Sequence, residues 1–130
     1  VGCETGLFLA ERGHEVTILE KKEETAADVT PENRRYLLEQ FRACQVVLMP
    51  GVTVGRFYAD GVDYTRADGS SGSARGFDNV VLAMGARPDT SLQEAVRARA
   101  AQVFVVGEAA HAPGNAVQAT GDALDAALAI

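Results

Sequence analysis

Apolar residues in the first part of the chain alternate between helical spacing and short continuous runs. Residues 2–12 predict a helix, and Gly13 follows it as a residue that readily adopts the left-handed conformation of a helix end. The run Val16–Leu19 is apolar and β-branched and stops at Glu20, which predicts a buried strand. Residues 21–29 are charged or small and predict a loop.

A second helix and a second strand follow in the same order. Thr30 and Pro31 are typical of a helix start, with a hydroxyl at the N-cap and a proline in the first turn. Apolar residues then recur at helical spacing as far as Cys44, and the run Val46–Met49 predicts a second buried strand.

From Val52 onward the apolar residues recur at every second position, which predicts antiparallel strands. The turn pairs Asp60-Gly61 and Asp68-Gly69 divide these strands into a meander. The stretch Gly69–Gly76 is rich in glycine and serine and predicts a loose hairpin tip.

The last part of the chain predicts two more buried strands, Asn79–Met84 and Val103–Val106, each followed by a glycine. A short helix is expected over residues 91–99 and a final helix from about Val117. Strands that alternate with helices indicate an α/β fold. The expected architecture is a Rossmann-like parallel sheet with an antiparallel β-meander as a crossover.

Composition excludes several classes of function. The net charge of −6 argues against a nucleic-acid partner, because the chain has too few cations to neutralise a phosphate backbone. No apolar run is long enough for a membrane span and no signal peptide is apparent, so a cytoplasmic location is expected. Cys3 and Cys44 fit no metal or redox spacing, which predicts two reduced thiols, no metal site and no disulfide chemistry.

The start of the chain contains half of a dinucleotide-binding motif. The motif is a strand, G-x-G-x-x-G and a helix, with an acidic residue about twenty positions further on. Gly2 suits the third glycine, and Glu20 suits the acidic residue that accepts hydrogen bonds from the ribose. A carboxylate there favours NADH because it repels the 2′-phosphate of NADPH, although Lys21 or Lys22 could instead meet a phosphate. The alternative is a packing glycine and a strand-end glutamate without a ligand.

Three separated stretches resemble flavoprotein pyridine-nucleotide oxidoreductases. VGCETGLFLAERGHEVTILE resembles their NAD-binding region, and DNVVLAMGARPDTSL resembles the strand that returns from it. VFVVGEAAHAPGNAVQATGDALDAALAI resembles their second FAD motif. The order and spacing are most similar to the C-terminal region of old-yellow-enzyme-like reductases, which include 2,4-dienoyl-CoA reductase, 2-enoate reductase and trimethylamine or histamine dehydrogenase.

The resemblance implies positions for the cofactors NAD and FAD. In the NADH site, Gly2 would lie by the pyrophosphate and Glu4 near the nicotinamide. Glu20 would bind the ribose, and Gly85 would let the cofactor approach the backbone. Toward FAD, the pair Gly107-Glu108 stands where the family has Gly-Asp, and Val117 would offer a backbone N–H at a helix start.

The resemblance also implies a division of the chain. Residues 1–90 would form an NAD-binding domain that lacks its first strand, and residues 91–130 the C-terminal piece of an FAD-binding domain. FMN and an iron–sulfur cluster would belong to a preceding barrel. A sheet without its central strand exposes unpaired edges, so we expect a longer chain, a homo-oligomer, or recruitment of Val103–Val106 into the sheet.

The sequence is compatible with two functions. The first is the part of a flavoprotein oxidoreductase that positions NADH for hydride transfer to FAD, with no catalytic acid or base of its own. The second is a non-catalytic nucleotide-binding or oligomerisation module that retains the Rossmann-like fold.

We expect the 130-residue chain by itself to bind FAD weakly and to be inactive. A flavin diphosphate normally lies on the first βα turn of its own fold, and the printed sequence does not contain that turn. After incubation with FAD and desalting, the purified chain should carry far less than one flavin per molecule. A preparation that stays yellow with stoichiometric flavin would overturn this expectation.

Overall fold

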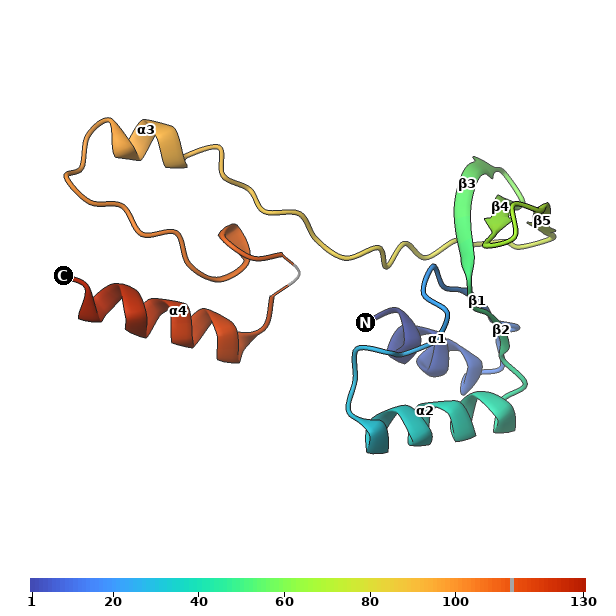
Figure 1. Cartoon of the computed structure of the whole chain (residues 1–130). Helices are drawn as coiled ribbons and strands as arrows, with labels where there is room; N and C mark the ends of the chain where they lie inside the picture. Colours follow the sequence, from blue (N-terminus) through green and yellow to red (C-terminus); the bar gives the residue numbers. More distant parts are fainter. Residues whose placement is uncertain (113) are drawn as a thin grey trace. The chain divides into compact units, whose positions relative to one another are not determined.

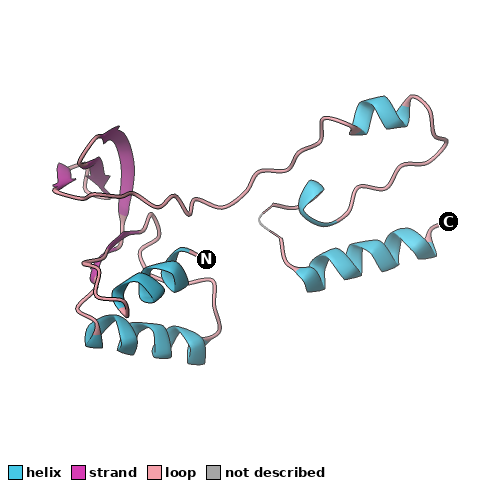
Figure 2. Cartoon of the chain, turned by 180° about the vertical axis from the view of Figure 1, so that it is seen from behind, coloured by secondary structure: helices cyan, strands magenta, loops and turns pink. Residues whose placement is uncertain are grey.

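The computed structural model describes residues 1–112 and 114–130 and divides into two compact units, Val1–Ala83 and Met84–Ile130 (Figure 1). The first unit holds a parallel sheet, an antiparallel sheet and two helices, and the second holds helices joined by extended chain (Figure 2). The mixed α/β class with both kinds of sheet is therefore confirmed.

The first unit begins with an alternation of helices and strands. Helix α1 (Gly2–Ala10) leads to strand β1 (Thr17–Leu19), and helix α2 (Pro31–Ala43) leads to strand β2 (Val47–Met49). β1 and β2 pair in parallel, with Ile18 opposite Leu48. The two helices and two strands were all predicted from the apolar spacing, and they lie within one or two residues of the expected bounds.

Local signals set the ends of these helices. Gly13 has a φ of +85°, the left-handed conformation that lets the chain reverse after α1. Thr30 is the N-cap of α2, and its hydroxyl oxygen accepts a hydrogen bond from the Asn33 amide at 3.5 Å. Pro31 follows in the first turn, where its missing N–H leaves no bond unmade.

The core of the first unit lies where α1, α2 and the loop between β1 and α2 meet. Its buried members are Leu7 of α1, Leu37 and Phe41 of α2, and Ala26 of the loop, of which Phe41 is only 1% exposed. Ile18 and Leu48 bring the parallel sheet against this cluster. The partly buried residues that complete it are Cys3, Val29, Leu38, Cys44 and Val46.

The antiparallel sheet has the order β3 (Val52–Tyr58), β4 (Gly61–Arg66) and β5 (Ser71–Arg75). The meander was predicted, but the expectation of a loose tip over Gly69–Gly76 is wrong because β5 pairs with β4 there. The reason is packing: the Tyr64 ring lies over Gly72, where a Cβ would come within 2.7 Å of it. Glycine in this strand makes room for a buried tyrosine.

The second unit contains a short helix α3 (Gln93–Arg97), a 3-10 turn η1 (Gly107–Ala109) and helix α4 (Ala116–Leu128). Both helices were expected. Asn115 caps α4 by accepting a hydrogen bond from the Gln118 amide at 2.9 Å. Large apolar side chains stay exposed here, including Val117 at 83% and Leu128 at 78%.

Two predicted strands are not formed. Asn79–Met84 and Val103–Val106 are extended but have no strand assignment, and Leu82 is 62% exposed rather than buried. A strand needs a neighbour for its backbone hydrogen bonds, and within the described residues the parallel sheet consists of β1 and β2 alone. Recruitment of Val103–Val106 into that sheet is therefore wrong for this structure. β2 is also less buried than expected, because Val47 is 53% exposed.

The fold predicts a sharp difference between two aromatic residues of α2. Phe41→Ala should lower the free energy of unfolding by about 3–5 kcal/mol, because it removes the most deeply buried side chain of the core. Tyr36→Ala is the matched control, since Tyr36 is 55% exposed, and it should change that free energy by no more than about 0.5 kcal/mol. Urea unfolding followed by circular dichroism measures both, and equal losses would contradict the described core.

Candidate functional site

The candidate nucleotide site of the first unit begins at the N-terminus of α1. The Thr5 amide donates to the Val1 carbonyl at 2.9 Å, which is the first hydrogen bond of the helix. The amides of Gly2, Cys3 and Glu4 precede this bond and have no acceptor within the helix. Such amides, together with the helix dipole, suit a phosphate or another anion.

Glycine at position 2 meets a steric requirement. A Cβ on Gly2 would lie 2.9 Å from the Cβ of Ala83, which is closer than side chains pack. Gly6, one turn further along α1, is buried, and a Cβ there would lie 3.0 Å from Cδ1 of Ile18 in β1. Both glycines therefore allow α1 to approach its neighbours closely, as the third glycine of a dinucleotide motif does.

Glu20 stands directly after β1, at its carboxyl end, where the sequence placed it. Its Oε1 accepts a hydrogen bond from the Lys22 amide at 2.9 Å, which orients the half-buried carboxylate. Its backbone continues the sheet, since its N–H donates to the Met49 carbonyl at 3.0 Å. The side chains of Lys21 and Lys22 are exposed.

Cys3 lies in the first turn of α1, and its side chain packs against the cluster that contains Ala26 of the following loop. Burial raises the pKa of the Cys3 thiol, a hydrogen bond with the Ala26 backbone partly lowers it, and the carboxylates of Glu20 and Asp28 raise it by smaller amounts. α1 and β1 pack together at Gly6 and Ile18, and Glu20 follows Ile18 by two residues. A shared dinucleotide site for Gly2 and Glu20 stays a prediction.

Glu4 is fully part of α1 but points to solvent. Its side chain is 74% exposed, and its Oε2 lies 3.3 Å from the amino group of Val1. An exposed pair of this kind contributes little to stability. The predicted role of Glu4 near the nicotinamide is untested by these contacts.

Arg34 is a residue that the sequence analysis missed. From α2 its Nε donates to the Thr25 carbonyl at 3.0 Å, and its Nη2 lies 3.1 Å from the Glu24 carboxylate. The loop it holds contains the buried Ala26 in a left-handed conformation at φ +55°. No sequence signal distinguishes Arg34 from the adjacent Arg35, because only the folded loop brings the carbonyl and carboxylate within reach.

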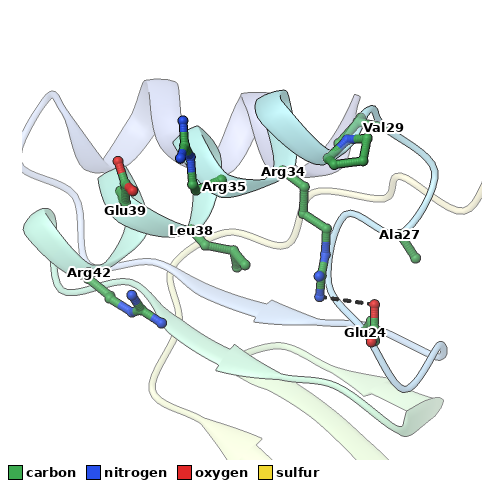
Figure 3. A pocket seen from close by; sticks show the side chains of 9 residues that line it. Glu24, Ala27, Val29, Arg34, Arg35, Leu38, Glu39 and Arg42 are labelled. Atoms are coloured by element: carbon green, nitrogen blue, oxygen red, sulfur yellow. Dashed lines mark ion pairs between the residues drawn. The ribbon is translucent and has the colours of Figure 1, made fainter.

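A shallow pocket of about 430 Å³ lies between α2 and the preceding loop (Figure 3). The Arg34–Glu24 pair forms one side of it. The pocket contains none of the predicted cofactor residues, so it is separate from the site at the start of α1. Its lining residues are Glu24, Ala27, Val29, Pro31, Arg34, Arg35, Leu38, Glu39 and Arg42.

The second unit brings its candidate residues together around η1. Gly107 opens this turn with a φ of +64°, and its amide donates to Oδ2 of Asp122 in α4 at 3.1 Å. The same oxygen lies 3.8 Å from Nε2 of His111. Glu108 is exposed on the turn. Asp122 was not singled out from the sequence, because nothing there shows that its side chain reaches back to Gly107.

The remaining candidates of this unit occupy chain turns and ends. Val117 is the second residue of α4, so its amide is among those without an acceptor in the helix. Gly85 has a φ of +79° and no atom within 4 Å of the position of a Cβ, which leaves its backbone open to a ligand. The cofactor contacts of Val117 and Gly85 stay predictions.

Some chemistries find no support in the described part of the chain. Among residues 1–112 and 114–130, no group of three His, Cys, Asp or Glu side chains could hold a metal ion. Cys3 and Cys44 are both free thiols. Within the same residues, no helix combines the length and apolar character needed to cross a bilayer.

Comparison with known proteins agrees with this geometry. Residues 1–125 match the family described as pyridine nucleotide-disulphide oxidoreductase. The chain belongs to the pyridine nucleotide-disulphide oxidoreductase family. The family depends on pyridine nucleotide and FAD, so the predicted cofactors NAD and FAD are those of the family.

Two curated relatives show the same redox character. A bilirubin reductase of Mediterraneibacter gnavus is 37% identical over 108 residues, which are 83% of this chain and 16% of that protein. An NADH oxidase of Thermoanaerobacter brockii is 33% identical over 110 residues, which are 84% of this chain and 17% of that protein. The chain therefore spans about a sixth of the length of these relatives.

A solved structure supports the fold directly. A complex of 2-naphthoyl-CoA reductase with 2-naphthoyl-CoA matches with a TM-score of 0.73 and 30% identity, over 92% of this chain and 18% of that one. The Rossmann-like class predicted from the alternation of strands and helices is thereby confirmed, and the chain is a pyridine-nucleotide oxidoreductase domain.

The environment of Cys3 predicts a thiol of low reactivity. Because burial and neighbouring carboxylates raise its pKa, less thiolate is present at a given pH than in a free thiol. At pH 8, iodoacetamide should alkylate Cys3 at least about tenfold more slowly than glutathione. In urea the Cys3 thiol is no longer buried, so its alkylation rate should rise to that of a cysteine in an unfolded peptide. Peptide mass spectrometry follows the rate, and an equally fast reaction in the folded chain would contradict the described packing.

Proposed function

We propose that this chain is the NADH-handling part of a flavoprotein oxidoreductase, together with a C-terminal piece of its FAD-binding domain. The observation that carries the proposal is the position of Glu20 at the carboxyl end of β1, the strand against which α1 packs. In open α/β sheets, ligands bind beyond the carboxyl ends of the strands. The finer likeness to old-yellow-enzyme-like reductases is part of the same proposal.

The residues of the first unit suit a dinucleotide. The amides at the start of α1 would bind the pyrophosphate, which Gly2 lets approach because it has no side chain. The oriented Glu20 carboxylate would accept hydrogen bonds from the adenosine ribose and repel a 2′-phosphate, so NADH is preferred over NADPH. Glu4 projects from the same turn of α1 that carries Gly2. Gly85 belongs to the second unit and is assigned to the same cofactor because its backbone is open.

The second unit supplies contacts of an FAD site. Gly107 and Glu108 form a turn that suits the ribityl and pyrophosphate part of a flavin, and Val117 offers a backbone N–H. Glu108 replaces the usual aspartate of the family, so its carboxylate reaches further by one methylene. Residues 1–90 are assigned to the NAD-binding domain and residues 91–130 to the FAD-binding domain.

The chemistry itself belongs to the cofactors. NADH, when bound, supplies a hydride and FAD accepts it. The residues of this chain bind the nucleotide, orient it and exclude water, and none of them needs to act as an acid or base. The match covers only 16% and 17% of the two relatives. The substrate oxidant and any FMN or iron–sulfur cluster are therefore assigned to the whole protein, as are a cytoplasmic location and a homo-oligomer or longer chain.

A non-catalytic nucleotide-binding or oligomerisation module is the second candidate. It is favoured by the exposed apolar side chains of α4, such as Val117 and Leu128, which would be covered in an assembly. A G-x-G pair on a strand immediately before Val1 would support the enzyme, and a natural chain without it would support the module.

Glu20 should determine cofactor preference. Replacing Glu20→Ala in the full-length protein removes the ribose hydrogen bonds, so affinity for NADH should fall by about tenfold or more. Affinity for NADPH should fall much less, because loss of the carboxylate also removes repulsion of the 2′-phosphate. Fluorescence titration with each nucleotide measures the two dissociation constants.

Glu15→Ala is the matched control for this experiment. Glu15 is exposed and precedes β1, at the end of the strand opposite to Glu20. Its replacement should leave both dissociation constants unchanged. Equal losses of NADH and NADPH affinity on Glu20→Ala, or tighter NADH binding, would refute the assignment.

A further inference from the structure

Asp122 joins two segments of the second unit that are separate in sequence. Its carboxylate oxygen Oδ2 accepts the Gly107 amide at 3.1 Å across fifteen residues of chain. Ala119, Asp122 and Ala126 are the half-buried positions of α4 and lie on one face of the helix. Asp122 is the only one of the three that can form a hydrogen bond through its side chain.

Both backbone groups of Gly107 form hydrogen bonds. While its amide donates to Asp122, its carbonyl accepts from the amides of Ala110 and His111, both at 2.9 Å. A Cβ at Gly107 would lie 3.3 Å from the Cβ of Ala119, so α4 packs closely against the turn. The left-handed φ of +64° at Gly107 is thus fixed by contacts on the helix and on the turn.

We infer that Asp122 is a positioning residue that holds η1 against α4 and so sets the spacing of the two flavin contacts, the Glu108 turn and the Val117 amide. This inference rests on the proposed function of the second unit. Glu108 follows Gly107 directly, and Val117 lies on the same helix as Asp122. One hydrogen bond therefore links the element that carries the first contact to the element that carries the second.

His111 is the other charged or titratable group that faces this oxygen. Its Nε2 lies 3.8 Å from Oδ2, beyond hydrogen-bond distance, and its side chain is 57% exposed. Asp122 is 23% exposed and makes the shorter contact with the backbone. The positioning role is accordingly assigned to the Asp122–Gly107 bond and not to the histidine.

Three substitutions in the full-length protein test this role. Asp122→Ala removes the acceptor, Asp122→Asn keeps an oxygen acceptor of the same length, and Asp125→Ala removes an exposed aspartate one turn later as the control. The first measurement is the hydrogen-exchange rate of the Gly107 amide. The second is the dissociation constant of the complex between FAD and the apoprotein.

Asp122→Ala should speed exchange of the Gly107 amide by about tenfold and weaken FAD binding by about tenfold, because the turn is released. Asp122→Asn should restore both readings to within about threefold of the wild type, and Asp125→Ala should change neither. If Asp122→Ala does not fold, Asp122→Ser takes its place, since its shorter side chain does not reach the Gly107 amide.

Other results would overturn the inference in distinguishable ways. Unchanged exchange at Gly107 in Asp122→Ala, or equal effects of Asp125→Ala, would show that Asp122 does not hold the turn. Faster exchange with unchanged FAD affinity would show that the held turn does not position flavin. Glu108→Ala separates the causes: if it weakens FAD binding, only the role of Asp122 fails, and if it does not, the proposed function of this turn fails.

Discussion

The close approach of α1 to β1 is the contact on which the candidate nucleotide site depends. It is possible because Gly6 has no side chain where Ile18 packs, and any Cβ there would press within 3.0 Å of it. Glycine lowers the stability of an isolated helix by up to about 1 kcal/mol relative to alanine. In this chain that loss is offset by packing, since Gly6 lets α1 lie close against Ile18 and Val16.

Elements with local signals could be predicted from the sequence. The N-cap at Thr30, the left-handed Gly13 and the turn signal at Asp60-Gly61 act over a few residues, so α2, the end of α1 and the meander were predicted. The turn itself lies one residue earlier, at Ala59 and Asp60, because Gly61 already pairs as the first residue of β4. Glu20 could be placed because strand ends are marked by a change from apolar to charged residues. These features need no knowledge of distant parts of the chain.

Elements that depend on partners could not be predicted in the same way. Asn79–Met84 has the composition of a buried strand, yet composition does not provide a neighbour for its backbone. The sequence predicts a loose tip in place of β5, because glycine and serine are typical of loops. The packing of Tyr64 against Gly72, which accounts for the strand, is a contact between distant residues that composition does not reveal. Arg34 and Asp122 act on carbonyl and amide groups nine and fifteen residues away, and residue type alone does not reveal such contacts.

The loop after β1 separates the residues that anchor it from those that are exposed beside Glu20. Thr25 and Ala26 are buried and are fastened to α2 by Arg34, whereas Lys21 and Lys22 are exposed near Glu20. Substitutions at the exposed end therefore leave the core intact, while the anchored end keeps the path of the backbone. Such a division lets the exposed end of the loop accept substitutions during evolution while the fold is retained.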